Sequence, residues 1–496
     1  MSSYSILEEH FSRLHHLQHV EAMLSWDAAT MMPAKSHQAR ADAMATLSLL
    51  IHESLNSTTL KESFEQLDEA SLTDEEKKSV REMRRTWRLA TCLPADLVKQ
   101  QSLAAAKCEH GWREQRPDNN WGGFVSNFRD VVRLAREEAT YRSKVTGLSL
   151  YDALLDKFEP GMTSEKLDVI FGELKSWLPN LIRQITERQK GEAVQLPKGP
   201  FSIDTQKQVG EKIMTLFGFD FDRGRLDVSV HPFCGGVPED VRLTTRYNED
   251  DFTQSLMGVV HETGHAKYEQ GLPESLRHLP VGKARSTAIH ESQSLFMEMQ
   301  IGRSSAFLES IHAILIDEFG DQDALSLENL KTLYLKVKPD FIRVDADEVT
   351  YPAHVMLRYE IEKDLVEGKI EVEDIPMLWK KKMQMYLGVD TADNVKNGCM
   401  QDIHWSIGAF GYFPTYTLGA MYAAQFMAAM KKTLPNVEER IAKGDLTDLQ
   451  AWLSQHVWTK GCLDTTEELV FNATGETLNT EYFKMHLVNR YLSTEK

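Results

Sequence analysis

The chain has 496 residues and a net charge of −18, from 74 acidic and 56 basic side chains. This excess of negative charge argues against nucleic acid or an anionic membrane as a partner. No stretch approaches the roughly eighteen apolar residues of a membrane span, and the N-terminus lacks the basic and apolar regions of a signal peptide. Because the five cysteines are scattered and form no CxxC pair, we expect a reducing, cytoplasmic location.

Helical periodicity dominates the chain from its start. Leu7, Phe11, Leu14 and Leu17 form one apolar stripe, and the segments 73–91, 164–189 and 447–458 show similar patterns. The same first segment contains "HHLQH" at 15–19, but it lacks a neighbouring carboxylate base, so we interpret it as an ordinary amphipathic helix. The composition therefore predicts a mainly α protein, with one clear loop at 190–204.

Residues 225–247, "RLDVSVHPFCGGVPEDVRLTTRY", depart from the helical pattern. Alternating segments flank a Gly-Gly-Val-Pro turn, which predicts two short strands. A strand directly before the next helix could hold an extended peptide by β-addition.

That next helix carries the main chemical signal, "HETGH" at 261–265. Asn248 and the acidic residues after it predict the helix start, and Gly271 predicts its end. On such a helix His261 and His265 lie about 40° apart, opposite the apolar stripe, so both imidazoles can face a cleft.

Two histidines at this spacing can bind one Zn²⁺ ion, and Glu262 beside them can act as the general base on a metal-bound water. The HExxH pattern arises by chance in roughly 5% of chains this rich in histidine, so the pattern needs its helical context. A purely structural metal site would need no Glu262 and would close its fourth position, which argues against a non-catalytic metal-stabilised scaffold.

A catalytic zinc site requires a third protein ligand. Tyr268 and Gly271 exclude the metzincin pattern, in which glycine and histidine occupy these positions. A glutamate from a following helix is the other solution, and Ser286 is a plausible cap for a helix that carries Glu291. We favour Glu291, with His290 as its nearest rival; the full set of candidates is Glu269, Glu274, His278, His290, Glu291 and Glu298.

At these residues the chain resembles the carboxypeptidase Taq family of metallocarboxypeptidases. The resemblance rests on HETGH and on HESQSL at 290–295, and further family-like blocks follow in consistent order over nearly the whole chain. These blocks are LSWDAATMMP (24–33), HPF (231–233), DVRLT (240–244), IRVDAD (342–347), GCMQDIHW (398–405), FGYFPTYTLG (410–419) and ATGETLN (473–479).

The resemblance implies a single domain over 1–496, mainly α-helical and gluzincin-like, with a deep substrate groove and a small β element. It implies that the enzyme removes C-terminal residues from peptides with Zn²⁺, or sometimes Co²⁺, and is a homodimer. It assigns His261, His265 and Glu291 as ligands and Glu262 as general base. The alternative is a groove-type oligopeptidase or dipeptidase that uses the same metal site.

The other family-like blocks supply candidate substrate-binding residues. Arg343 could bind the terminal carboxylate of a peptide, because its guanidinium matches a carboxylate bidentately. His404, with Tyr412 or Tyr416, could donate to the oxyanion, and the sequence leaves the choice of tyrosine open. Three further residues flank the β element, and we interpret them as structural parts of the groove more than as catalytic residues: His231, Asp240 and Arg242.

Overall fold

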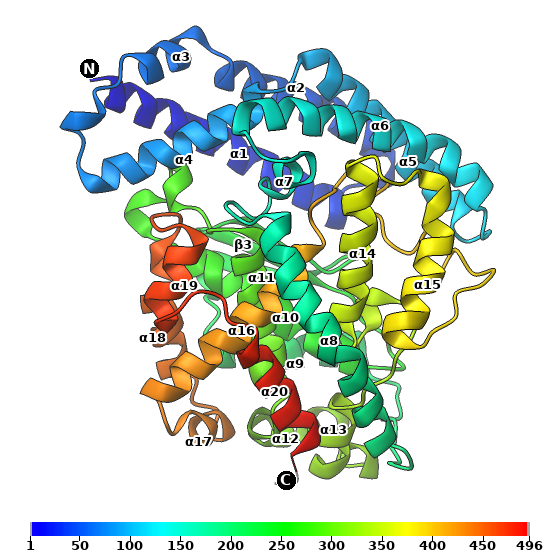
Figure 1. The fold of residues 1–496 in the computed structure, drawn as a ribbon. Helices are drawn as coiled ribbons and strands as arrows, with labels where there is room; N and C mark the ends of the chain where they lie inside the picture. Colours follow the sequence, from blue (N-terminus) through cyan, green and yellow to red (C-terminus); the bar gives the residue numbers. More distant parts are fainter. Residues whose placement is uncertain (1, 494–496) are drawn as a thin grey trace.

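The computed structural model describes residues 2–493, which form two layers of helices. Figure 1 shows the N-terminal helices lying across the top of the molecule, over a larger body formed by the rest of the chain. The N-terminal layer consists of α1 (Ser3–Thr30), α2 (His37–Leu55), α3 (Thr58–Glu65), α4 (Asp74–Thr91), α5 (Ala95–Gln115) and α6 (Trp121–Thr146).

The remaining helices follow a short α7 (Leu150–Leu155) and form the body (Figure 1). In chain order they are α8 (Ser164–Arg188), α9 (Ile203–Leu216), α10 (Thr253–Gly271), α11 (Thr287–Leu295), α12 (Ser305–Phe319), α13 (Leu327–Tyr334), α14 (Tyr351–Val366), α15 (Ile375–Leu387), α16 (Pro414–Thr433), α17 (Val437–Ala442), α18 (Thr447–His456), α19 (Thr466–Thr474) and α20 (Glu481–Leu492).

The helices predicted from periodicity are confirmed. In α1, Leu7, Phe11 and Leu14 of the predicted apolar stripe are buried, whereas Leu17 is only half-buried. Helix α4 begins with a capping box, in which the Thr73 side chain accepts from the Glu76 backbone N–H and the Glu76 carboxylate accepts from that of Thr73. The loop expected at 190–204 connects α8 to α9.

The β element has three strands, so the prediction of two strands was wrong. The strands are β1 (Gly224–Val228), β2 (Cys234–Val237) and β3 (Asp240–Thr245), in the order β1-β3-β2. Strands β2 and β3 form the antiparallel hairpin, with Val237 opposite Asp240, whereas β1 pairs with β3 in parallel. The alternation in the sequence identified β1 and β3, and it missed β2 because "CGGV" carries two glycines.

Helix α10 begins later than predicted. Asn248 accepts from the Asp250 N–H and closes a turn. Phe252 is the N-cap residue and has no side-chain cap, whereas Asp251, just before it, accepts from the Thr253 N–H (2.8 Å) and hydroxyl (2.6 Å). The polar residues 248–251 therefore form a turn that precedes the helix. The predicted end at Gly271 is confirmed.

Helix α11 packs against both α10 and α16 in the centre of the body. A Cβ atom at Gly264 of α10 would lie 2.4 Å from the Gln293 carbonyl oxygen of α11. A Cβ at Gly419 of α16 would lie 2.8 Å from Cγ of Glu291 on α11. Glycine at both positions is therefore what allows the three backbones to approach this closely.

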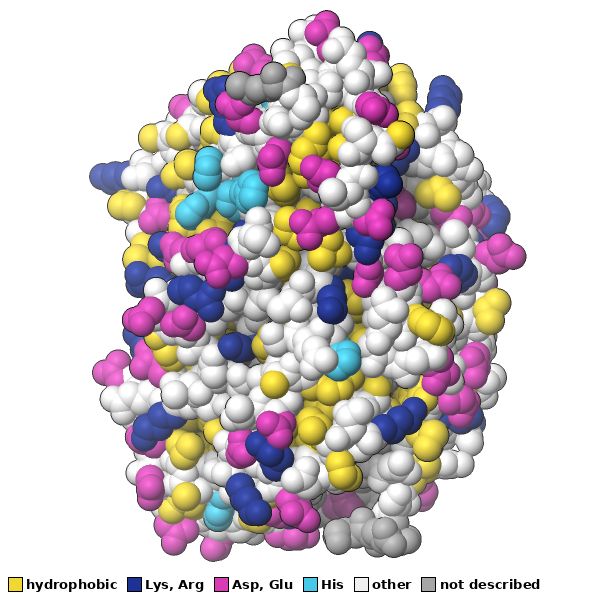
Figure 2. All heavy atoms as spheres, turned by 90° about the vertical axis from the view of Figure 1, so that its left-hand side faces the viewer, with side chains coloured by type: hydrophobic (Ala, Val, Ile, Leu, Met, Phe, Trp, Pro, Cys, Tyr) yellow, Lys and Arg dark blue, Asp and Glu magenta, His cyan; other side chains and the backbone are white. Residues whose placement is uncertain are grey.

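One large apolar core runs through the body from α6 to α20, and a smaller one packs α1, α3 and α4 on the connection between α10 and α11. No helix within residues 2–493 is long and apolar enough to cross a membrane. On the face of the molecule in Figure 2, basic and acidic side chains are interspersed, and no large field of one sign is visible.

Candidate active site

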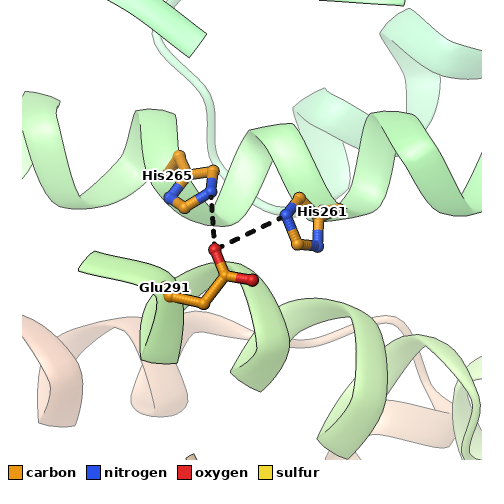
Figure 3. Close-up of side chains that lie close together, drawn as sticks. All are labelled: His261, His265 and Glu291. Atoms are coloured by element: carbon orange, nitrogen blue, oxygen red, sulfur yellow. Dashed lines mark ion pairs between the residues drawn. The ribbon is translucent and has the colours of Figure 1, made fainter. Parts of the chain in front are cut away.

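His261 and His265 of α10 face Glu291 of α11, as Figure 3 shows. The distance from Glu291 Oε2 to Nε2 is 3.3 Å for His265 and 3.9 Å for His261. One donor atom from each of the three residues lies within 4.8 Å of the other two, and this is the one group of possible metal ligands found among residues 2–493. Helix α11 is capped by Ser286, as predicted, which places Glu291 in its second turn.

The donor set fits a divalent cation. Two imidazole nitrogens and one carboxylate oxygen, with room for further ligands, are typical of catalytic zinc sites. Two further carboxyl groups, Glu262 and Glu298, lie beside these donors. Burial lowers the pKa of His261, but the hydrogen bond to Glu298 and the nearby carboxylates outweigh burial and raise this pKa to about 10. The same charges would attract a metal ion.

Glu262 is buried beside the two histidines. Burial is the main cause that raises the pKa of its carboxyl to about 7, and the charge of His261 opposes this shift. Burial also lowers the pKa of His265 to about 4, so this ring is neutral at pH 7 and can act as a ligand. The arrangement therefore combines one neutral imidazole, His265, with a carboxyl group, Glu262, whose proton affinity suits a general base.

Glu298 supports His261 from behind. It lies on η6 (Phe296–Gly302), a π-helical segment that continues α11 and turns Glu298 towards α10. Its Oε2 atom lies 3.0 Å from Nδ1 of His261, and its Oε1 accepts from Arg303 at 2.7 Å. A carboxylate in this position fixes the ring so that Nε2 is free for a metal ion.

The three candidate ligands lie on a cavity of about 1350 Å³ between the two layers of helices. Side chains of α4, including Glu82, Arg85 and Leu89, line its upper side, while α10, α11 and α16 line the lower side. Of the candidate substrate-binding residues, four line this cavity: His231, Arg343, Tyr412 and Tyr416. Asp240, Arg242 and His404 do not.

Arg343 is buried at the cavity wall and is held by residues that the sequence analysis did not select. Its Nε and one terminal nitrogen donate to Asp402 at 3.0 and 2.8 Å, and its other terminal nitrogen donates to Tyr351 at 2.5 Å. Its ion-pair partner is thus Asp402, distant in sequence, and not the acidic residues of its own IRVDAD block. Because a guanidinium has five N–H groups, two remain for a ligand.

Asp402 belongs to the family-like block GCMQDIHW, from which the sequence analysis selected His404 alone. The charges of Arg343 and Arg358 hold the pKa of Asp402 well below its usual range, although burial alone would raise it. The preceding residue, Gln401, accepts from the Arg343 backbone N–H at 2.7 Å. The block therefore acts mainly by holding Arg343 in place.

His404 pairs with Tyr416 and not with Tyr412. Its Nε2 lies 3.1 Å from the Tyr416 hydroxyl oxygen, and its Nδ1 is buried without a partner among the described residues. An unpaired acceptor is tolerated better than an unpaired N–H, which favours a proton on Nε2 that is donated to Tyr416. The Tyr416 hydroxyl hydrogen can then be donated to the neighbouring Tyr412 hydroxyl or, in its place, to a ligand in the cavity.

Asp240 and Arg242 form an ion pair that packs against the N-terminal layer. Two nitrogens of Arg242 donate to the two oxygens of Asp240 at 2.9 and 2.6 Å, and its guanidinium lies 4.4 Å from the ring centroid of Trp26. Trp26 belongs to α1, so this pair connects β3 to the N-terminal layer.

The histidines of "HHLQH" lie on α1, and the structure does not gather them into a three-ligand group. The ring centroids of His15 and His16 are 5.6 Å apart. On the face of the molecule that Figure 2 draws, histidine side chains are clustered in the upper part. The five cysteines are all free, and Cys234 lines the cavity.

An HExxH helix, a glutamate from the next helix and a cavity between helical layers together define a helical metallopeptidase. The chain belongs to the carboxypeptidase Taq (M32) metallopeptidase family, whose model matches residues 6–491. It is therefore a metallocarboxypeptidase, a hydrolase of peptide bonds.

The sequences of named carboxypeptidases align with this chain over nearly their full length. The chain is 36% identical to thermostable carboxypeptidase 1 of Thermus thermophilus, over 99% of this chain and 98% of the relative. It is 35% identical to carboxypeptidase 1 of Bacillus subtilis, over 97% and 96%. Among solved structures, Trypanosoma cruzi metallocarboxypeptidase 1 has a TM-score of 0.97 at 46% identity, over 99% of both chains. Pyrococcus furiosus carboxypeptidase has a TM-score of 0.95 at 32% identity, also over 99% of both chains.

Proposed function

We propose that this carboxypeptidase uses Zn²⁺, or alternatively Co²⁺, held by His261, His265 and Glu291. The observation that supports this proposal is the convergence of these three side chains from two helices on one point of the cavity. When bound, the ion supplies a Lewis acid and lowers the pKa of a coordinated water towards about 7.

Side chains of the protein carry out proton transfer and stabilise the developing oxyanion. Glu262 takes the proton from the attacking water and passes it to the nitrogen of the departing amino acid. Tyr416, oriented by His404, donates its hydroxyl hydrogen to the oxygen of the scissile carbonyl as negative charge develops there. Tyr416 is preferred to Tyr412 because of its contact with His404.

Arg343 is the proposed anchor for the C-terminal carboxylate of the peptide. Its two remaining N–H groups can bind both oxygens, and Asp402 and Tyr351 hold the guanidinium in a fixed orientation. A fixed anchor places the last peptide bond, and no other, at the metal centre. His231 lines the same cavity and is a further candidate contact for the peptide.

The assembly and location of the protein are also proposals. We infer a single catalytic domain and a homodimer from the family resemblance, which spans nearly the whole chain. A cytoplasmic location is supported by five cysteines that form no disulfide among the described residues.

The decisive experiment incubates the zinc- and cobalt-loaded enzyme with a ladder of short peptides, each with a free or an amidated C-terminus. Mass spectrometry should show stepwise loss of C-terminal residues from the free peptides and little cleavage of the amidated ones. Internal cleavage of both series would instead support the oligopeptidase alternative. Absence of cleavage with either metal would contradict the proposed metal centre.

A further inference from the structure

We propose that His290, held by Glu269, is a positioning residue that fixes the proton on His265 and thereby sets the affinity of the site for its metal ion. This inference rests on the proposed function, because it concerns how one of the proposed ligands is held. His290 and Glu269 were themselves candidates for the third ligand from sequence. The structure places them behind His265, on the side away from Glu291.

The contacts form a chain of three side chains. Nδ1 of His265 lies 2.6 Å from Nδ1 of His290, and Nε2 of His290 lies 2.8 Å from Oε1 of Glu269. Glu269 lies one turn after His265 on α10, and His290 directly precedes Glu291 on α11. The chain therefore connects the same two helices that supply the proposed ligands.

The metal ion determines the direction of each hydrogen bond in this chain. Nε2 of His265 faces Glu291, so a metal ion there requires this nitrogen to be unprotonated. The proton of the neutral His265 ring then sits on Nδ1 and is donated to Nδ1 of His290. His290 can accept it only if its own proton is on Nε2, from which it donates to the Glu269 carboxylate, which can only accept. Each atom thus has one role.

The two proposed histidine ligands are held in different ways. A carboxylate, Glu298, contacts His261 directly, whereas His265 contacts a second imidazole, His290, which in turn contacts a carboxylate. The support of His265 therefore depends on the tautomer of His290 as well as on its position. Loss of this support should reduce metal affinity roughly 10- to 100-fold, the usual cost of removing such an outer contact.

Two isosteric substitutions of His290 separate the role of each nitrogen. In His290→Asn the amide oxygen can occupy the place of Nδ1, so it can still accept from His265. In His290→Gln the polar group reaches the place of Nε2, so the contact with Glu269 can remain while the acceptor for His265 is lost. We expect the asparagine variant to bind Zn²⁺ nearly as tightly as the wild type and the glutamine variant to bind roughly 10- to 100-fold more weakly.

Affinity is measured by competition with a chromophoric chelator, and the visible spectrum of the Co²⁺-loaded protein reports the geometry at the ion. His278→Asn, in the same connection but outside the cavity lining, is the matched control. The melting temperature of each metal-free variant separates loss of the fold from loss of metal. Equal affinity of the asparagine and glutamine variants, or tighter binding by the glutamine variant, would overturn the proposal.

Glu269 is tested through its coupling to His290. Glu269→Gln should weaken Zn²⁺ binding in the wild-type background and have no effect in the His290→Asn background, where the chain is already cut. An equal effect in both backgrounds would contradict the relay. Zn²⁺ binding by the wild type at one ion per chain tests the proposed function separately, so failure of the metal centre and failure of the relay are distinguishable.

Discussion

Glu262 illustrates how the site works at the scale of a single residue. Its carboxylate is buried next to two proposed ligands without being one of them, and burial raises its pKa to about 7. A group with this pKa can both accept a proton from water and release it near neutral pH.

Replacing Glu262 with glutamine should therefore leave the metal bound and remove the base. We expect kcat to fall roughly 10²- to 10⁴-fold, the usual contribution of a general base. Metal content by elemental analysis should stay at one ion per chain. Glu274→Gln, an exposed glutamate outside the cavity, is the control. Retained turnover in Glu262→Gln would remove this residue from the mechanism.

Arg343 permits a second test at this scale. Arg343→Lys keeps the charge but loses the paired N–H donors, so kcat/KM for free peptides should fall roughly 10- to 100-fold, as expected for one or two lost charged hydrogen bonds. Discrimination against amidated peptides should shrink by the same factor. Arg246→Lys serves for comparison, since Arg246 is also a cavity-lining cation. A loss of discrimination in that variant alone would place the anchor at Arg246.

Residue spacing predicted the centre of the site well and its surroundings poorly. His261, His265 and Glu291 converge as expected, because i,i+4 spacing and one helical return fix their geometry locally. Asp402 and Tyr351 could not be predicted as partners of Arg343, because contacts between distant segments leave no periodic signal. His404 was selected for its chemistry, but in the structure it contacts Tyr416 and does not line the cavity.

At the scale of elements, the close approach of α10 and α11 determines whether the ligands meet. The helical pattern predicted both helices, whereas the third strand, β2, was missed because its glycines resemble a turn. The periodicity of the sequence does not predict the distance between α10 and α11, which depends on the absence of a side chain at Gly264.

Two glycine-to-alanine substitutions on α10 test this point. In Gly264→Ala the new methyl group would overlap the backbone of α11, so the helices must separate, at a cost of about 1–3 kcal/mol in unfolding free energy. Metal affinity should fall with it. Gly258→Ala is the matched control, because its nearest neighbour, the Thr245 hydroxyl, would be 3.8 Å away. Equal metal affinity in both variants would show that helix spacing does not control the site.

Helix α20 provides a pH-dependent test of how the cavity wall is held. Glu348, near Arg343, is buried and contacts Arg490, Tyr491 and His486 of this helix. Burial alone would raise the pKa of Glu348, but the charge of Arg490 and the hydrogen bonds from His486 and Tyr491 outweigh burial and hold it well below the usual range. A carboxyl with a lowered folded-state pKa stabilises the fold above its unfolded pKa of about 4.3, and this contribution is lost as the pH falls.

Glu348→Gln should accordingly destabilise the protein by about 3–5 kcal/mol at pH 7, because it leaves buried charges unpaired. The difference from the wild type should shrink as the pH falls from about 5 towards 3. Denaturant unfolding at several pH values measures it, with the exposed Glu481→Gln on the same helix as control. A difference that does not depend on pH would mean that Glu348 is not ionised in the folded protein.

For the whole molecule, the proposed ion would link α10 to α11 in the centre of the body. Saturating Zn²⁺ at 100 times its Kd should add about 2.7 kcal/mol to the stability of the folded state, and chelation should remove it. The thermal midpoint should therefore rise with zinc in the wild type and in Glu262→Gln, but not in Glu291→Gln. A zinc-induced rise in Glu291→Gln would place the ion elsewhere.

Helix α4 lines the side of the cavity opposite α10, α11 and α16, and it therefore restricts which substrates can reach the proposed metal site. A tightly folded protein cannot thread its end between two packed layers, whereas a short, unstructured peptide can. Such an enzyme would depend on endopeptidases that first cut polypeptides into short fragments, from whose C-termini it would then release single amino acids.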